Sequence, residues 1–339
     1  TGTNKLSNTN NLRTTVVNDF NYSSNDLISK QGFKNNFKLY LKNLNAIGKN
    51  DSIYTSNAQI DGMSTLKIDS SFPLSRSKNM IEETLVPKVS FRINPGNNMD
   101  NYSGSSANIT TDNVFDINRL GISNDFEAGR SLTFGVDYKF NKIENNQSED
   151  TKDKYLEFKL ATVIRDQSEN DIPISSTINK KNSDLFGTFN NQLFDNVNLT
   201  YDFSLDNDMK TINSNEVKTE ISINNFITTF NFIEQRNDIG STHLLSNVTE
   251  YKVSERTSLK FSTRRNKKIN LTEYYDLSYE YKNDCLTAAL KFNKSFYQDN
   301  DLKPTEDLFF SVTLIPLTTY EREIYKKTHG QSGIKGWFR

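Results

Sequence analysis

The chain has 339 residues, a formal net charge of -1 and an apolar content of 34%. This length suits a large core, but few residues are available to fill one, which disfavours a single compact soluble core. The longest apolar runs, such as Leu308-Phe309-Phe310, fall far short of the roughly 20 apolar residues of a transmembrane helix. Acidic and basic residues nearly balance and are spread along the chain, which argues against a nucleic-acid partner.

The chain has one cysteine, Cys285, so no disulfide forms within it and no thiolate zinc site is available. It begins with Thr1-Gly2-Thr3, without an initiator Met, a basic n-region or an apolar h-region. We therefore expect it to be the downstream part of a longer polypeptide.

Alternation of apolar and polar residues recurs along the chain and predicts β-strands with one face of each kind. The clearest cases are 132–140, 197–205 and 275–281. Weaker alternation predicts further strands at 13–21, 32–44, 56–68, 83–94, 115–126, 153–165, 185–191, 215–224, 226–236, 242–253, 257–266, 285–298 and 306–317. The total is about sixteen strands, with boundaries good to a few residues. Several reach the roughly 9 to 11 residues that a tilted strand needs to cross a bilayer.

The predicted connections are of two kinds. Tight turns are expected at 127–130, 206–208 and 283–284, whereas 94–111, 141–152 and 164–184 are long and polar. Short turns at one end and long loops at the other are typical of outer-membrane barrels. We therefore predict an all-β, antiparallel transmembrane barrel over residues 1–317, as part of a larger barrel. The segment 318–339 is a polar, basic tail without alternation and is expected to be disordered.

Two other interpretations account for parts of the pattern. A soluble β-sandwich or solenoid also alternates, but it uses shorter strands or a fixed repeat, and no such repeat is present. A partly disordered, Asn-rich chain is the second alternative. The polarity of the chain agrees with a wide barrel, because half of each strand then faces an aqueous interior.

The sequence has no pattern that indicates catalysis, a metal or a cofactor. His243 and His329 lack a second ligand at suitable spacing, and no nucleophile elbow, phosphate loop or dinucleotide motif occurs. Asp206-Asn207-Asp208 lacks the Gly and the other ligands of a calcium loop and indicates a turn. Adjacent Glu82 and Glu83 point to opposite faces of a strand, so they cannot act on one bond. We expect a protein that binds or conducts something and is not an enzyme.

Two stretches of the sequence carry recognisable motifs. The first consists of Tyr281, Asp284, Cys285, Phe296, Tyr297, Asp299, Asp301, Leu302, Lys303, Pro304, Phe310, Val312, Leu314 and Leu317. It resembles the last two strands of the LptD family of lipopolysaccharide-assembly proteins of the Gram-negative outer membrane. The second resembles an N-R-[FL] … E-x-G-x-R-L-x-[YF]-G segment of the family, through Asn118, Arg119, Leu120, Glu127, Gly129, Arg130, Leu132, Phe134 and Gly135. Phe72-Pro73-Leu74 and Leu85-Val86-Pro87 are weaker matches. Asp125-Phe126 and Thr318 depart from the family pattern.

The resemblance implies a 26-stranded barrel behind a periplasmic jelly-roll domain, of which this chain would be the C-terminal part. It implies lipopolysaccharide transport and assembly at the outer membrane, without a cofactor. Sugars would pass through the polar lumen, and the molecule would leave sideways into the membrane where the first and last strands meet. The implied partners are lipopolysaccharide, outer-membrane lipid, a plug lipoprotein inside the barrel, and a periplasmic bridge that acts through the N-terminal domain.

The family mechanism and the physics of strand pairing both indicate the last predicted strand as one side of the lateral gate. Unpaired backbone groups in a bilayer cost several kcal/mol each, so a barrel opens most easily where its ladder is interrupted. Pro316 removes one ladder donor. We expect the strand 308–317 to form one side of the lateral gate, through Leu308, Phe310, Val312, Leu314 and Pro316; the alternative is that Pro316 only ends the strand.

Cys285 matches in position the family cysteine that bonds to the N-terminal periplasmic domain. The alternative is a free thiol. Among functions, a different large barrel of the porin or importer type is the first alternative to a lipopolysaccharide translocon subunit, and a soluble β-rich adhesin is the second.

Overall fold

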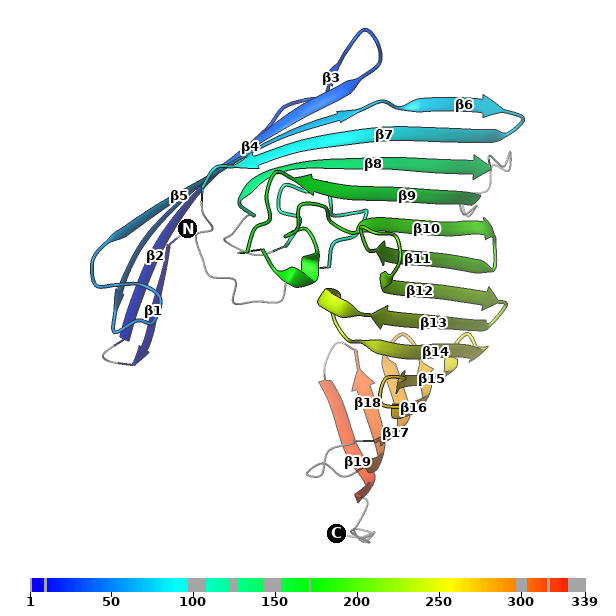
Figure 1. Cartoon of the computed structure of the whole chain (residues 1–339). Helices are drawn as coiled ribbons and strands as arrows, with labels where there is room; N and C mark the ends of the chain where they lie inside the picture. Colours follow the sequence, from blue (N-terminus) through cyan, green and yellow to red (C-terminus); the bar gives the residue numbers. More distant parts are fainter. Residues whose placement is uncertain are drawn as a thin grey trace.

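A computed structural model describes residues 2–8, 11–96, 108–121, 127–142, 154–170, 172–296, 304–315 and 318–328. Within these ranges the chain forms one antiparallel sheet and two short 3-10 turns, η1 (Ile174–Ser176) and η2 (Asn237–Ile239) (Figure 1). The strands are β1 (Gly2–Asn8), β2 (Asn11–Ser23), β3 (Leu27–Ile28), β4 (Lys34–Lys49), β5 (Gln59–Ser71), β6 (Leu74–Lys78), β7 (Ile81–Asn94), β8 (Gly129–Lys142), β9 (Lys154–Arg165), β10 (Leu185–Phe194), β11 (Val197–Leu205), β12 (Ile212–Ile223), β13 (Phe226–Gln235), β14 (His243–Ser254), β15 (Thr257–Asn266), β16 (Leu271–Lys282), β17 (Leu286–Ser295), β18 (Thr305–Leu314) and β19 (Thr318–Thr328). The described residues include no helix long and apolar enough to span a membrane.

Each strand pairs with its neighbour in the chain, apart from two interruptions. β2 and β3 both pair with β4, and β5 and β6 both pair with β7, so each of these pairs is one broken strand. The break between β5 and β6 falls at Phe72-Pro73, opposite Pro87 of β7. Proline cannot donate to the ladder, and the remaining contact there is the Phe72 N–H donating to the Pro87 carbonyl at 3.0 Å. The described strands leave the sheet open: β1 pairs only with β2, and β19 only with β18.

The two faces of the sheet differ in chemistry, as the alternation predicts. In β8, Leu132 and Phe134 are 39% and 44% exposed, whereas Ser131 and Thr133 between them are buried. We call the face with Leu132 and Phe134 the outer face. Exposed apolar side chains recur on it along the sheet, including Leu259, Tyr275, Leu277, Tyr279, Leu290, Phe310 and Leu314. Such a face suits lipid, because strands that cross a bilayer alternate apolar outward and polar inward.

The opposite, inner face carries the small core of the molecule. Residues 108–121, between β7 and β8, and residues 172–178, between β9 and β10, fold against this face (Figure 1). Their apolar side chains pack with those of β9 and β10 in one cluster: Ile109, Val114, Leu120, Ala161, Val163, Ile172, Ile178 and Phe186. The core is therefore built between connections and sheet, not between two sheets.

The structure corrects two predictions in this region. The expected strand at 115–126 does not form: 111–120 is a series of turns, and 122–126 lies outside the described residues. Its apolar residue Leu120 is buried in the inner core, and Phe115 packs against that core instead of lying on a strand face. The expected turn at 127–130 is wrong for the same reason, because Glu127 ends a long connection and Gly129 starts β8.

The connections divide only in part as predicted, because the tight turn expected at 206–208 joins β11 to β12 at the end of the sheet that holds the long links. Links of a few residues join β10 to β11, β12 to β13, β14 to β15 and β16 to β17 at one end of the sheet. The opposite end holds the long links from β7 to β8 and from β9 to β10. The long link from β8 to β9 joins strands at the short-turn end, against expectation.

The sheet continues beyond its predicted last strand. Residues 318–328, expected to be disordered, form β19, which pairs with the whole of β18 from Leu314↔Thr318 to Thr305↔Thr328. The polar and charged residues of this segment do not alternate with apolar ones, so the sequence pattern does not predict a strand. The strand forms nevertheless, because backbone pairing does not depend on side-chain polarity. Residues 329–339 of the predicted tail lie outside the described residues.

Candidate functional site

A buried cluster of charges joins the inward-folded connection to three strands. Glu127 stands just before β8, Arg119 lies in the turns of 108–121, and Arg92 and Arg165 are on the inner faces of β7 and β9. All four side chains are at most 3% exposed. We call these residues the arginine cluster.

Glu127 is the centre of the arginine cluster. Its Oε1 lies 3.2 Å from Arg92 Nη1 and 3.0 Å from Arg165 Nη1. Arg119 binds the same carboxylate with both ends of its fork, and its Nε donates to Oε2 at 2.7 Å. Bidentate Arg–carboxylate pairs are among the strong and geometrically specific polar contacts.

Several of the remaining guanidinium donors reach backbone and hydroxyl groups, whereas the buried Arg165 Nε has no hydrogen-bond partner among the described residues. Arg92 donates to the Glu127 carbonyl at 2.7 Å, and Arg119 donates to Thr133 Oγ1 and Ser131 Oγ, both at 3.0 Å. Burial of charge is costly unless it is paired and hydrogen-bonded. The arginine cluster meets that requirement largely with groups of the connection and of β8, and so fixes the connection to the sheet.

The electrostatics of Glu127 follow from this packing. Burial alone raises the pKa of the carboxyl group, but the positive charges of Arg119, Arg92 and Arg165 outweigh it and lower the pKa to about 2. Glu127 is therefore ionised throughout the physiological range.

Two glycines of the predicted motif make room for the same region. Gly129 has a φ of +86°, a left-handed conformation that favours glycine, and a Cβ there would lie 2.8 Å from Arg165 Nη2. A Cβ at Gly135 would lie 2.7 Å from Cζ of Phe115 and 3.0 Å from the Leu160 carbonyl oxygen. The Phe115 ring thus packs directly on the backbone of β8.

The structure brings only part of the predicted motif together. Arg119, Glu127, Gly129 and Gly135 converge on the inner face. Asn118 precedes Arg119, and its carbonyl accepts the Gly121 N–H at 3.2 Å. Arg130 is exposed, 4.0 Å from Asp166, and Pro304 stands immediately before β18, far along the chain.

Sequence reasoning missed Arg92, Asn94 and Arg165. Asn94 donates to the Glu127 carbonyl at 3.2 Å. The alternation of the strand could have indicated Arg92. It lies between Phe91 and Ile93, so it faces inward with Ser90 and Asn94. Alternation indicates the face on which Arg92 lies, but it does not indicate its partner Glu127, because Glu127 belongs to a connection.

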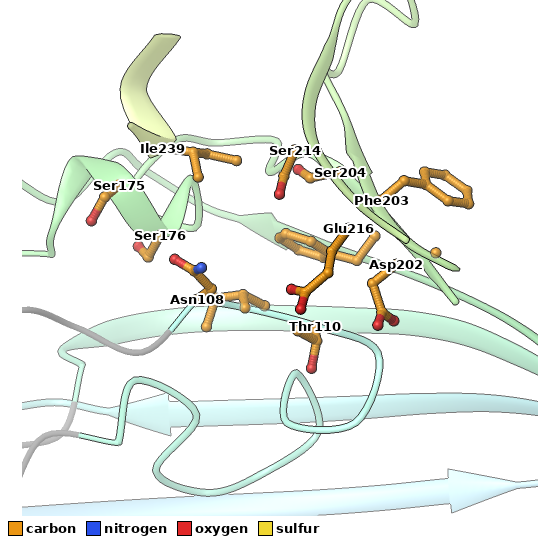
Figure 2. A pocket seen from close by; sticks show the side chains of 13 residues that line it. Asn108, Thr110, Ser175, Ser176, Asp202, Phe203, Ser204, Ser214, Glu216 and Ile239 are labelled. Atoms are coloured by element: carbon orange, nitrogen blue, oxygen red, sulfur yellow. The ribbon is translucent and has the colours of Figure 1, made fainter. Parts of the chain in front are cut away.

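A small cavity lies between the two inward-folded connections and β10–β12 (Figure 2). The carboxylates of Asp202 and Glu216 enter it from paired positions on β11 and β12. Hydroxyl, amide and apolar groups complete the lining, from Asn108, Ile109, Thr110, Ser175, Ser176, Phe186, Ser204, Ser214 and Ile239. The polar inner wall thus offers hydrogen-bond donors and acceptors to the lumen. No group of residues suited to hold a metal occurs among the described residues.

The predicted gate residues lie together on β18. Leu308, Phe310, Val312 and Leu314 share its outer face, with Phe310 and Leu314 40% and 44% exposed. β18 is not the last strand, however, because β19 pairs with its other edge. Pro316 lies outside the described residues.

Cys285 is exposed, in the short link between β16 and β17. Its backbone N–H donates to Asn283 Oδ1 at 3.0 Å. The thiol therefore lies at the short-turn end of the sheet. The predicted disulfide would have its partner outside the described residues.

The fold and the site together define a class of protein: a wall of antiparallel strands, apolar outside and polar inside, as in β-barrels of the outer membrane. The chain belongs to the LptD family, whose description is LPS transport system D and which matches residues 38–257. The matched segment runs from β4 to the start of β15 and contains the arginine cluster. The C-terminal resemblance at 281–317 falls outside it. No curated protein matches the chain.

Membership in this family assigns the chain to lipopolysaccharide transport and assembly at the outer membrane.

Proposed function

We propose that this chain forms part of the wall of a lipopolysaccharide translocon and guides the sugar part of the lipid along its inner face. The observation that carries the proposal is the contrast between the two faces of the sheet. Outward side chains such as Leu132 and Phe134 are apolar and exposed, while the inner face presents charges and hydroxyls. A molecule with acyl chains and a large polar sugar part needs both surfaces side by side.

The partners follow from the family and are proposed with it. Lipopolysaccharide would reach the barrel from a periplasmic bridge that acts through an N-terminal domain. A plug lipoprotein would occupy the lumen, next to the inward-folded connections. The short-turn end of the sheet would face the periplasm, because short turns lie on that side in outer-membrane barrels.

β18 is the proposed gate strand of this chain. Its outward row of Leu308, Phe310, Val312 and Leu314 is apolar throughout, as a strand exposed to lipid at an opening seam requires. The role proposed for Pro316 is to shorten the ladder at the end of this strand by removing one donor.

Depletion of the protein in its native host tests the proposed function. We expect lipopolysaccharide to disappear from the cell surface and to accumulate behind the outer membrane, and we expect the chain to fractionate with outer membranes and to require detergent for extraction. Normal surface lipopolysaccharide after depletion would favour a porin or importer, and extraction without detergent would favour an adhesin.

A further inference from the structure

The edge of β18 that faces away from β17 is covered by β19. The two strands pair over their full length, with one bulge that leaves Ile324 out of register between Tyr325 and Glu323. Within the described residues, no strand pairs with the other edge of β19. β19 is therefore the end strand of the described sheet, and it pairs with β18, the proposed gate strand (Figure 1).

One outward side chain of β19 does not suit a position on the lipid face. Arg322 pairs with Phe310 and so stands on the outer face, in the middle of the apolar row of β18. Tyr320 and Tyr325 lie outward on either side of it, while Glu321, Glu323 and Lys326 face inward and Lys327 stands outward only near the end of the strand, opposite Glu306. The only charged residues of β18 are Glu306 and Asp307, both at its start. A charged side chain on the lipid face is destabilising, most strongly for Arg and Lys at mid-membrane.

Few side-chain contacts hold β19 in place. Thr313 and Thr319 share a hydrogen bond of 3.1 Å between their hydroxyl oxygens. Lys326 lies 3.9 Å from Asp307, at the limit of an ion pair. A contact this long, with Lys326 half exposed, contributes little to stability, so the attachment rests mainly on backbone hydrogen bonds. Any other strand with an apolar outer face supplies the same backbone bonds without the penalty of Arg322.

We propose that β19 is a detachable strand that covers the edge of β18 and leaves it when that edge pairs with a strand of the barrel wall whose outward side chains are apolar. The outward charge of Arg322 makes β19 the weaker competitor for the edge. Its coverage prevents β18 from pairing with strands of other molecules, a known hazard of open edges. The proposal rests on the proposed function only in taking the β18 edge as one side of the gate.

Hydrogen exchange tests the detachment without reference to lipopolysaccharide. In lipid nanodiscs, we expect the amides of β19 that bond to β18 to exchange at least tenfold faster than the amides of β17 that bond to β18. Arg322→Leu, which removes the outward charge, should slow that exchange at least fivefold, while the matched control Arg322→Lys should not. Exchange of β19 as slow as that of β17, or a fast exchange that Arg322→Leu leaves unchanged, would overturn the proposal.

A reversible lock tests whether detachment is used in transport. Ser311 and Glu321 are cross-strand partners on the inner face, so Ser311→Cys with Glu321→Cys places a disulfide between β18 and β19. We expect surface lipopolysaccharide to fall at least fivefold on oxidation and to recover on reduction. The control, Ala289→Cys with Ser311→Cys, locks β17 to β18 and should have no effect.

A β18–β19 lock with no effect would overturn the use of detachment in transport and leave the proposed function standing, because the same cells still deliver lipopolysaccharide. Failure of the unlocked protein to support delivery would instead contradict the proposed function, and the exchange experiment would still decide whether β19 detaches.

Discussion

Glu127 is the residue on which the inner structure depends most, because one carboxylate is shared by three buried guanidinium groups. Glu127→Gln preserves the shape of the side chain but leaves that positive charge without its counter-charge. We expect a loss of about 3–5 kcal/mol in the free energy of unfolding, measured by urea titration in detergent, since removing one partner of a buried ion pair has that effect. The control is Glu83→Gln, whose partner Arg76 is 75% exposed and which should cost less than about 1 kcal/mol. Equal losses in the two variants would contradict the account.

The pKa of Glu127 also predicts an acid limit for the fold. Because the pKa falls from its ordinary value of 4.5 to about 2 in the folded protein, the ionised group stabilises the fold above pH 4.5. That contribution is lost as the pH falls from 4.5 toward 2, where the carboxyl group becomes protonated. We expect the melting temperature of the wild type to drop over this range and that of Glu127→Gln to drop less. Parallel curves for the two proteins would show that Glu127 is not the titrating group.

Cys285 yields a prediction that needs only electrophoresis. If the exposed thiol bonds to a periplasmic domain, as proposed from its position, the protein from native membranes should migrate differently with and without reductant. Cys285→Ser should abolish the difference, and Ser254→Cys, at the end of β14 and at the same end of the sheet, should not restore it. A wild-type protein insensitive to reductant would establish a free thiol.

At the residue scale, the sequence predicts the site in part. Arg119, Glu127, Gly129 and Gly135 belong to a recognisable motif, and the structure brings them together. Arg92 and Arg165 escaped prediction because they contact Glu127 across connections whose folding no local pattern encodes. Burial of the connection, not strand alternation, determines that contact.

At the scale of elements, the contact between the 108–121 connection and β8 depends on the absence of a side chain at Gly135. Gly135→Ala places a Cβ within 2.7 Å of the Phe115 ring, while the rigid Leu160 carbonyl prevents retreat of the strand. We expect a cost of about 1–3 kcal/mol, the usual range for overpacking, and faster proteolysis within 108–121. The matched control is Gly62→Ala in β5, where the nearest atom to the new Cβ lies 4.0 Å away. Comparable proteolysis of both variants would contradict the packing role of Gly135.

Strand alternation predicts the elements well where each strand has one wet and one apolar face, as in β8, β11 and β16. It fails at 115–126, because Leu120 and Phe115 pack in or against the inner core and imitate the apolar side of a strand. It fails again at β19, whose outward row of Tyr320 and Tyr325 is interrupted by Arg322 and by the bulge at Ile324. In both places the segment lacks a regular alternation of outward apolar and inward polar residues: 115–120 packs on the inner face, and β19 carries a charge on the outer face.

At the scale of the whole molecule, the low apolar content of the chain has a structural explanation. The sheet buries few apolar residues, and its inner core forms only where connections fold back against β9 and β10. Many large apolar side chains lie exposed instead, including those on the outer face, as expected when the apolar surroundings are lipid and the interior is wet. Composition, face chemistry and family membership therefore agree on a wall between lipid and water.

The central claim, that lipopolysaccharide moves along the inner face, is tested most directly by photocrosslinking at two adjacent positions of β16. Ser278 faces inward and Leu277 outward, where it is 43% exposed. We predict that a photoreactive residue at position 278 captures lipopolysaccharide in cells and that capture stops when lipopolysaccharide synthesis is blocked, while capture of membrane lipid at position 277 persists. Absence of capture at 278, or capture there that does not depend on continued synthesis, would contradict the account.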